Sequence, residues 1–132
     1  MKENELMIGD YLYWGKDKVV KVQMLRKYGD NFGVDAIYND SVNLYFCTDN
    51  DDIYSYNIDE LKPIPLTPEI LEKNGFIKES RENHGNILQY CILTDGLWID
   101  VSGENYFEGK LEYIHQLQHV LRLCGIEKEI IL

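Results

Sequence analysis

The chain has 132 residues, 45% of them hydrophobic and 12% aromatic, so it has the apolar residues that a folded core requires and that a disordered chain lacks. This length fits one ordinary domain or two very small ones, and it excludes a large enzyme with its own cofactor-binding fold. The formal net charge of −10 is shared between the halves, because residues 1–66 and 67–132 each carry five more acidic than basic side chains.

Export and membrane insertion are not expected from the sequence. The opening segment Met1–Asp10 has no apolar core of the kind a signal peptide needs. The longest mostly apolar stretch, Ile87–Leu93, is far too short to span a bilayer. The three cysteines, Cys47, Cys91 and Cys124, are odd in number and widely spaced, which favours reduced thiols in a cytoplasmic protein.

A proline-rich segment divides the chain. All three prolines lie in Lys62–Pro68, and each fixes its own backbone and restricts the residue before it. We therefore expect one subdomain over 1–66 and a second over 67–132, packed as one compact unit.

The segment 1–66 has the pattern of short strands at roughly ten-residue spacing. Strands are expected over Tyr11–Trp14, Lys18–Arg26, Gly33–Tyr38, Val42–Thr48 and Ile53–Tyr56, followed by a helical turn over Asn57–Leu61 and an extended piece over Lys62–Leu66. This arrangement resembles a small SH3-like β-barrel, and the alternative is a strongly bent antiparallel sheet.

The segment 67–132 begins with signals for a short helix. Thr67 is suited to the N-cap, Pro68 to the first helical position, and Gly75 to the left-handed position that ends a helix. Phe76 can then pack back on Leu71. A strand is expected over Phe76–Ser80.

Asp95-Gly96 between two apolar runs predicts a β-hairpin of strands Ile87–Thr94 and Leu97–Val101. With Asp95-Gly96 as the two loop residues, Ile92 pairs with Ile99. The face assigned to the core then carries Tyr90, Ile92, Leu97, Ile99 and Val101, and the opposite face carries Gln89, Cys91, Leu93, Trp98 and Asp100.

The last part of the chain is expected to hold a loop over Ser102–Glu108, a helix over Tyr113–Leu123 and a short strand over Glu129–Leu132. The predicted fold class is therefore α+β: an N-terminal small SH3-like β-barrel or bent antiparallel sheet, followed by an antiparallel sheet with two helices.

His115 and His119 are four residues apart on the predicted final helix, the spacing with which zinc enzymes hold their metal. Gln116 stands where such an enzyme needs a glutamate base, and both histidines lie opposite the apolar stripe. We interpret them as part of a polar helix face and expect no bound metal.

No other pattern indicates catalysis or a cofactor. Each cysteine lies near an acidic group or at a helix end, where a thiolate is disfavoured. The acidic run Asp49–Asp52 lacks the glycine and glutamate of a calcium-binding loop. The glycines are scattered singly, so no phosphate-binding loop is expected.

A stretch without basic residues runs from Tyr28 to Leu61. Its acidic residues are Asp30, Asp35, Asp40, Asp49, Asp51, Asp52, Asp59 and Glu60, and its tyrosines are Tyr28, Tyr38, Tyr45, Tyr54 and Tyr56. Such a surface repels nucleic acid and attracts a basic protein. The alternative interpretation is that Tyr is a good strand former and Asp a good turn former. The candidate partner-binding residues are Tyr45, Tyr54, Tyr56 and Trp98.

Three stretches carry a resemblance over nearly the whole chain: Glu5–Tyr11, Lys62–Thr67 and Tyr113–Gln118. In this order they resemble a family of short uncharacterised proteins of gut anaerobes, found among prophage and mobile-element genes. The resemblance implies a small accessory protein of a mobile element, and it supplies no catalytic residue.

The function predicted from these observations is that of a non-catalytic module that binds a basic protein, with no cofactor, no nucleic acid and no membrane. One alternative is a DNA mimic that occupies a nucleic-acid-binding protein, which the net charge of −10 favours. The other alternative is a small enzyme.

Overall fold

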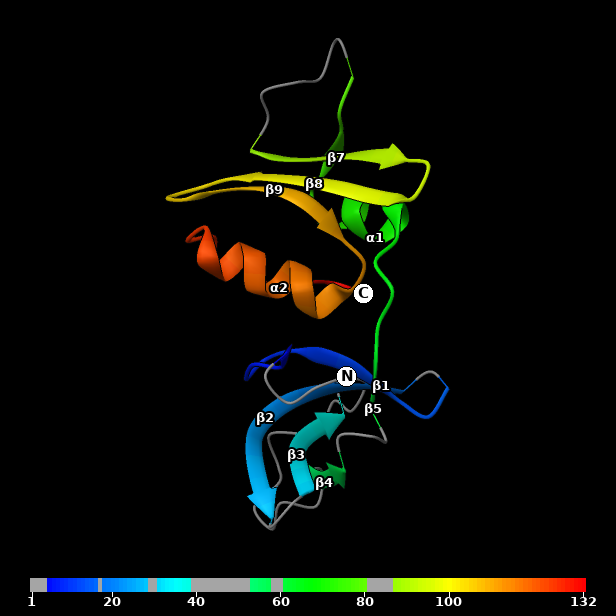
Figure 1. Ribbon diagram of the computed structural model, residues 1–132, viewed down its shortest axis with the longest axis vertical. Coiled ribbons are helices and arrows are strands. Elements are labelled where there is room, and N and C mark those ends of the chain that lie inside the picture. The colour runs from blue at the N-terminus through cyan, green and yellow to red at the C-terminus, as the bar shows by residue number, and fades with distance from the viewer. Residues whose placement is uncertain (1–4, 17, 29–30, 39–52, 58–60, 81–86) are drawn as a thin grey trace. The chain divides into compact units, whose positions relative to one another are not determined.

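A computed structural model describes residues 5–16, 18–28, 31–38, 53–57, 61–80 and 87–132, with the backbone alone over 24–28, 31–38 and 53–57 (Figure 1). The chain forms two compact units, Met1–Ile64 and Pro65–Leu132. They are called unit 1 and unit 2 below. The division falls within the proline-rich segment, two residues before the expected boundary.

Unit 1 is a five-stranded antiparallel sheet in the order β4-β3-β2-β1-β5. Its strands are β1 (Tyr11–Trp14), β2 (Lys18–Tyr28), β3 (Asn31–Tyr38), β4 (Ile53–Asn57) and β5 (Leu61–Pro63). The described strands do not close into a barrel, because the two edge strands, β4 and β5, are not hydrogen-bonded to each other. The expected strand Val42–Thr48 and residues 58–60 of the expected helical turn lie outside the described residues.

The long strand β2 bends where its pairing with β3 shifts. Val22 lies opposite Ala36, but Met24 lies opposite Asp35, so one extra residue is inserted between them. Such a bulge increases local bending and twist, and it interrupts the two-residue alternation expected along this strand. Before the bulge the alternation holds, because Val20 and Val22 are both fully buried.

A hydrogen-bonded turn over residues 7–10 precedes β1 in unit 1. The Asp10 side chain is fully buried and accepts a hydrogen bond from the Met7 amide at 2.7 Å. Gly9, with φ +93°, donates its amide to the Val22 carbonyl at 2.8 Å. The Gly9-Asp10 turn is thereby attached to β2.

Unit 2 is a four-stranded sheet in the order β6-β7-β8-β9, with both helices on the same side of it (Figure 1). The strands are β6 (Ile77–Lys78), β7 (Leu88–Leu93), β8 (Gly96–Ser102) and β9 (Tyr106–Leu111), and the helices are α1 (Pro68–Lys73) and α2 (Ile114–Leu123). β6 runs parallel to β7 and the other pairs are antiparallel. The α+β class is confirmed, but the sheet of unit 2 is mixed and not wholly antiparallel as expected. No helix in the described part of the chain is long and apolar enough to cross a membrane.

The ends of α1 are those that the sequence predicts. The Thr67 hydroxyl accepts a hydrogen bond from the Ile70 amide at 3.3 Å. At the other end Gly75 has φ +88°, and the Phe76 amide donates to the Leu71 carbonyl at 2.9 Å. This is the hydrogen bond of a Schellman motif, and both Leu71 and Phe76 are buried.

The helix α2 presents one apolar stripe to the sheet. Ile114, Leu117 and Leu121 are at most 1% exposed. Opposite them, the inward face of the sheet carries the buried side chains of Tyr90, Leu97, Ile99, Val101 and Leu111. The core of unit 2 therefore lies between the helices and this face.

The hairpin forms, but its register differs from the expected one. The turn places Thr94 and Asp95 between Leu93 and Gly96, so Ile99 pairs with Tyr90 and not with Ile92. Gly96 has φ +147°, a conformation that other residues rarely adopt, and it begins β8. The shift by two residues keeps every side chain on its expected face. It moves Ile92 to the end of the hairpin, where it is 54% exposed and not buried as expected.

Two expectations for the last part of the chain are wrong. Tyr106–Glu108, the last part of the expected loop, belongs to β9, in which outward residues alternate with Phe107, Gly109 and Leu111. The expected strand Glu129–Leu132 is irregular. It is held by the buried Asn74 side chain, whose Oδ1 accepts from the Ile131 amide and whose Nδ2 donates to the Ile131 carbonyl, each at 2.7 Å.

Candidate functional site

The four residues expected to bind a partner are described to different extents. Tyr45 lies outside the described residues. Tyr54 and Tyr56 belong to β4, where they pair with Ala36 and Val34, and their side chains are not described. Trp98 lies on β8, and its side chain is half-buried on the sheet face away from the helices. The described part of the candidate site is therefore built around Trp98.

The sheet face around Trp98 is open at the hairpin end and along β9. We call it the open face, and it consists of Cys91, Leu93, Trp98, Asp100, Tyr106, Glu108 and Lys110. Strand alternation and register place these side chains together, since Cys91 and Lys110 flank Trp98 and Glu108 lies opposite Asp100. Leu93 is 38% and Tyr106 60% exposed. Towards β6 the face is closed, because Gln89 is buried.

Two carboxylates face each other on the open face. Asp100 and Glu108 are direct cross-strand partners, an arrangement in which like charges repel. The Tyr106 hydroxyl contacts both, with Glu108 Oε2 as one partner and Asp100 Oδ2, at 3.4 Å, as the other. Since a hydroxyl has one proton, it donates to only one carboxylate at a time. Nearby, Lys110 forms an ion pair with Asp95 at the hairpin turn.

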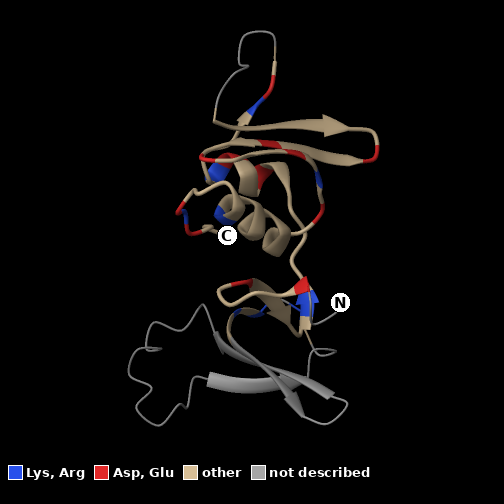
Figure 2. Ribbon diagram, turned by 60° about the vertical axis from the view of Figure 1, so that its left-hand side comes forward, with Lys and Arg blue, Asp and Glu red and all other residues tan. Residues whose placement is uncertain are grey.

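The electrostatics follow this geometry. Burial raises the pKa of the Asp100 carboxyl, and the charge of Glu108 raises it further, while the hydrogen bond with Tyr106 acts in the opposite direction. The hydrogen bond to Glu108 is the main reason why the pKa of Tyr106 is raised to about 12. The folded structure therefore disfavours the ionised form of Asp100 on the open face. Figure 2 shows the acidic positions in red.

Replacing Asp100 by Asn is expected to stabilise unit 2 at neutral pH. Because the folded-state pKa of Asp100 is raised, the native state binds the proton more tightly, and stability falls as pH rises through that pKa. Removing the like-charge pair should add about 0.2–1 kcal/mol to the free energy of unfolding. Urea melts at neutral pH and at about pH 4, near the ordinary pKa of Asp, test this. The gain should shrink at the lower pH, and a loss of stability at neutral pH would show that the pair is not repulsive.

Sequence reasoning missed the three residues that β9 contributes to this face, Tyr106, Glu108 and Lys110. Tyr106 and Glu108 fall in the segment expected to be a loop, and Lys110 follows it. The alternation of Tyr106, Glu108 and Lys110 with Phe107 and Leu111 was the signal that could have identified a strand.

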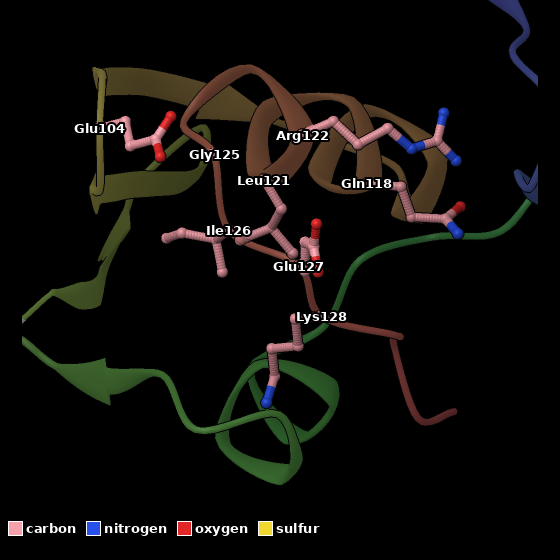
Figure 3. A pocket seen from close by; sticks show the side chains of 8 residues that line it. All are labelled: Glu104, Gln118, Leu121, Arg122, Gly125, Ile126, Glu127 and Lys128. Atoms are coloured by element: carbon pink, nitrogen blue, oxygen red, sulfur yellow. The ribbon is translucent and has the colours of Figure 1, made fainter.

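A second feature is an open cavity of about 500 Å³ in unit 2, beside the end of α2 (Figure 3). It is lined by Glu104, Gln118, Leu121, Arg122, Gly125, Ile126, Glu127 and Lys128. Leu121 and Ile126 provide its apolar part, and charged residues of both signs surround them. These lining residues include no serine, cysteine or histidine, the usual nucleophiles and bases of hydrolytic enzymes.

Of the two histidines of α2, His115 differs from expectation in its burial. It is 3% exposed, although both histidines were assigned to a polar helix face. The Tyr113 ring stacks on His115 at 5.9 Å, and the His119 ring meets it edge-on at 5.7 Å. Gln116, which takes the place of a catalytic base, accepts hydrogen bonds from the Glu112 and Tyr113 amides and thereby caps the helix. Among the described residues, no three metal-ligating side chains of His, Cys, Asp or Glu gather at one point.

The two described cysteines are free thiols with raised pKa values. Burial raises the pKa of Cys124, whose Sγ lies 3.9 Å from the Val101 carbonyl oxygen. Burial also raises the pKa of Cys91, to which Glu79 and Glu108 add their charges. Because the thiolate is the reactive form of cysteine, neither environment activates a nucleophile.

Comparison with family models, with curated proteins and with solved structures finds no match for this chain. The fold and the candidate site define it as an α+β protein of two small units, of which the second presents an acidic and aromatic sheet face.

Proposed function

We propose that this chain is a non-catalytic accessory module that binds a basic segment of a partner protein on the open face of unit 2. One observation carries the proposal: a sheet whose inward face forms the core leaves Trp98, Tyr106 and the carboxylates of Asp100 and Glu108 on its other face. Tyrosine and tryptophan are the residues that contribute most to protein interfaces. The carboxylate pair adds charge complementarity to a basic partner.

The arrangement of charges favours a protein-binding face over a DNA mimic. A mimic of duplex DNA needs carboxylates in a regular array that follows two phosphate backbones. The described carboxylates of the open face form one pair, with Lys110 two residues away on the same strand. The remainder of the face is apolar or aromatic, as in the centre of protein interfaces.

The proposal also covers the cellular compartment of the protein and the fold of unit 1. Free thiols at Cys91 and Cys124 fit a reducing cytoplasm, and the resemblance to proteins of prophages and mobile elements supports an accessory role there. We further propose that unit 1 is an SH3-like barrel. The strand order β4-β3-β2-β1-β5 and the bulge in β2 support this proposal.

Affinity capture with matched bait variants tests the proposed function. The wild-type chain and a Leu123→Ala control, altered at a 63% exposed position on α2, should retain the same basic protein from a lysate of the source organism. The Trp98→Ala bait should lose most of it, because removing an aromatic anchor costs about 2 kcal/mol or more of binding free energy. The purified partner is then titrated against all three chains. Equal affinity for wild type and Trp98→Ala, or an acidic partner, would contradict the proposal.

A further inference from the structure

The corner of the open face formed by Trp98, Asp100 and Glu108 has a defined spacing. Asp100 follows Trp98 by two residues on β8, so their side chains point to the same side about 7 Å apart along the strand. Glu108 stands directly opposite Asp100 on β9, where cross-strand Cβ atoms are about 5 Å apart. One flat aromatic ring therefore lies beside two adjacent carboxylates.

The carboxylates of this corner are positioned but not neutralised by their neighbours on the sheet. Tyr106 contacts one oxygen of each, Oδ2 of Asp100 and Oε2 of Glu108, and it brings no positive charge. Lys110, which lies opposite Trp98, forms its ion pair with Asp95. Glu79 adds a further negative charge near Cys91. A cation brought by a partner would complete the corner.

The geometry selects among cations. A guanidinium group is planar, stacks on an indole ring and offers several N–H donors in a fixed fork. From a position against Trp98 it can donate to both carboxylates at once. A lysine ammonium is a compact point charge without a flat face, and it is more strongly hydrated. Stacking and a forked hydrogen-bond pattern are both features that an arginine satisfies and a lysine does not.

We propose that Trp98, Asp100 and Glu108 form a recognition site for an arginine side chain of the partner segment, selected over lysine. The site rests on the proposed protein-binding function of the open face. The guanidinium lies against the indole ring of Trp98 and donates hydrogen bonds to Asp100 and Glu108. Tyr106 is a positioning residue, which holds the two carboxylates side by side.

Fluorescence anisotropy with two labelled peptides tests this proposal on the full chain at about 0.15 M salt. The probes are Gly-Ser-Arg-Gly-Arg-Ser-Gly and the same peptide with lysine in place of arginine, which carry equal charge. The wild-type chain should bind the arginine peptide about tenfold more tightly. Trp98→Leu, which keeps an apolar side chain on the strand, should reduce this preference to less than about threefold.

A charge-matched pair of variants separates recognition from general attraction. Asp100→Asn with Glu108→Gln should abolish binding of both peptides. Glu104→Gln with Glu127→Gln removes the same charge at the rim of the cavity beside α2, and it should leave affinity and preference unchanged. Thermal melts of each variant verify folding, and Asp100→Asn alone serves if the double variant fails to fold.

The peptide titrations distinguish failure of arginine selection from failure of the proposed protein-binding function. Equal affinity of the wild-type chain for the two peptides, lost in the Asp100→Asn, Glu108→Gln chain, would overturn arginine selection and leave the docking function standing. Absence of binding, or binding that the same double variant leaves unchanged, would overturn both.

Discussion

Truncation of Ile99 to Ala is expected to lower the free energy of unfolding of unit 2 by about 2–5 kcal/mol. Ile99 is fully buried in the central strand β8, between Tyr90 on β7 and Gly109 on β9. It points to the side of the sheet on which α2 buries Leu117 and Leu121. Removal of its side chain leaves a cavity that neighbours on two strands cannot fill without moving backbone. Urea melts followed by circular dichroism measure the loss.

Trp98→Ala is the matched comparison, since Trp98 is the next residue and lies on the opposite face. Trp98 is only half-buried, so its truncation removes fewer packed contacts and should cost less than truncation of Ile99. If the Trp98 variant loses more stability than the Ile99 variant, the core of unit 2 lies on the other side of the sheet, and the open face is not open.

Gly103→Ala is expected to destabilise unit 2 by about 3 kcal/mol or more. A Cβ atom at Gly103 would lie 2.2 Å from the Cys124 carbonyl oxygen and 3.2 Å from its carbonyl carbon. The loop cannot retreat without cost, because it caps the end of α2. The Glu104 amide donates to the Cys124 carbonyl at 2.7 Å, and Asn105 Nδ2 donates to the Leu123 carbonyl at 2.8 Å. The clash is with backbone, so it should exceed the about 1–3 kcal/mol typical of an overpacked core.

Gly109→Ala provides the control for this effect. At Gly109 the added Cβ would lie 3.1 Å from the ring of Phe107, a side chain that can rotate away. Melts of the two variants under the same conditions should show a clearly larger loss for Gly103→Ala. Equal losses would mean that the loop that caps α2 moves away from the added Cβ as easily as the Phe107 side chain does.

Local signals in the sequence predicted the elements that depend on local chemistry. The ends of α1 followed from Thr67, Pro68 and Gly75, each of which acts within one helical turn. The faces of β8 followed from alternation, so Ile99 and Trp98 were assigned to the correct sides. The hairpin was predicted as well, but its two loop residues were expected to be Asp95 and Gly96. They are Thr94 and Asp95, one residue earlier in the chain.

The errors arose where contacts distant in sequence determine the structure. Tyr106–Glu108, the first half of β9, was expected to belong to a loop, and the pairing with β8 that makes it a strand is a tertiary contact. The chain after Glu129 was expected to pair as a strand. Its partner is instead the Asn74 side chain, 57 residues away, which no periodicity in the sequence could indicate.

Only the part of the candidate site that depends on local signals was predictable from the sequence. Trp98 could be assigned to an outward face from the hairpin alone. The carboxylate pair could not, because Asp100 meets Glu108 only through β9. Tyr54 and Tyr56 lie on β4 and remain predictions as partner-binding residues.

The central claim, that the open face of unit 2 binds a basic partner segment, is tested most directly by ¹H–¹⁵N nuclear magnetic resonance of the full chain titrated with the arginine peptide. The claim predicts that the indole N–H of Trp98 and the amides of Asp100, Tyr106 and Glu108 shift first and saturate together, while those of Arg122 and Lys128 beside the cavity stay in place. Shifts confined to α2 and the cavity, or spread evenly over the acidic residues of both units, would contradict it.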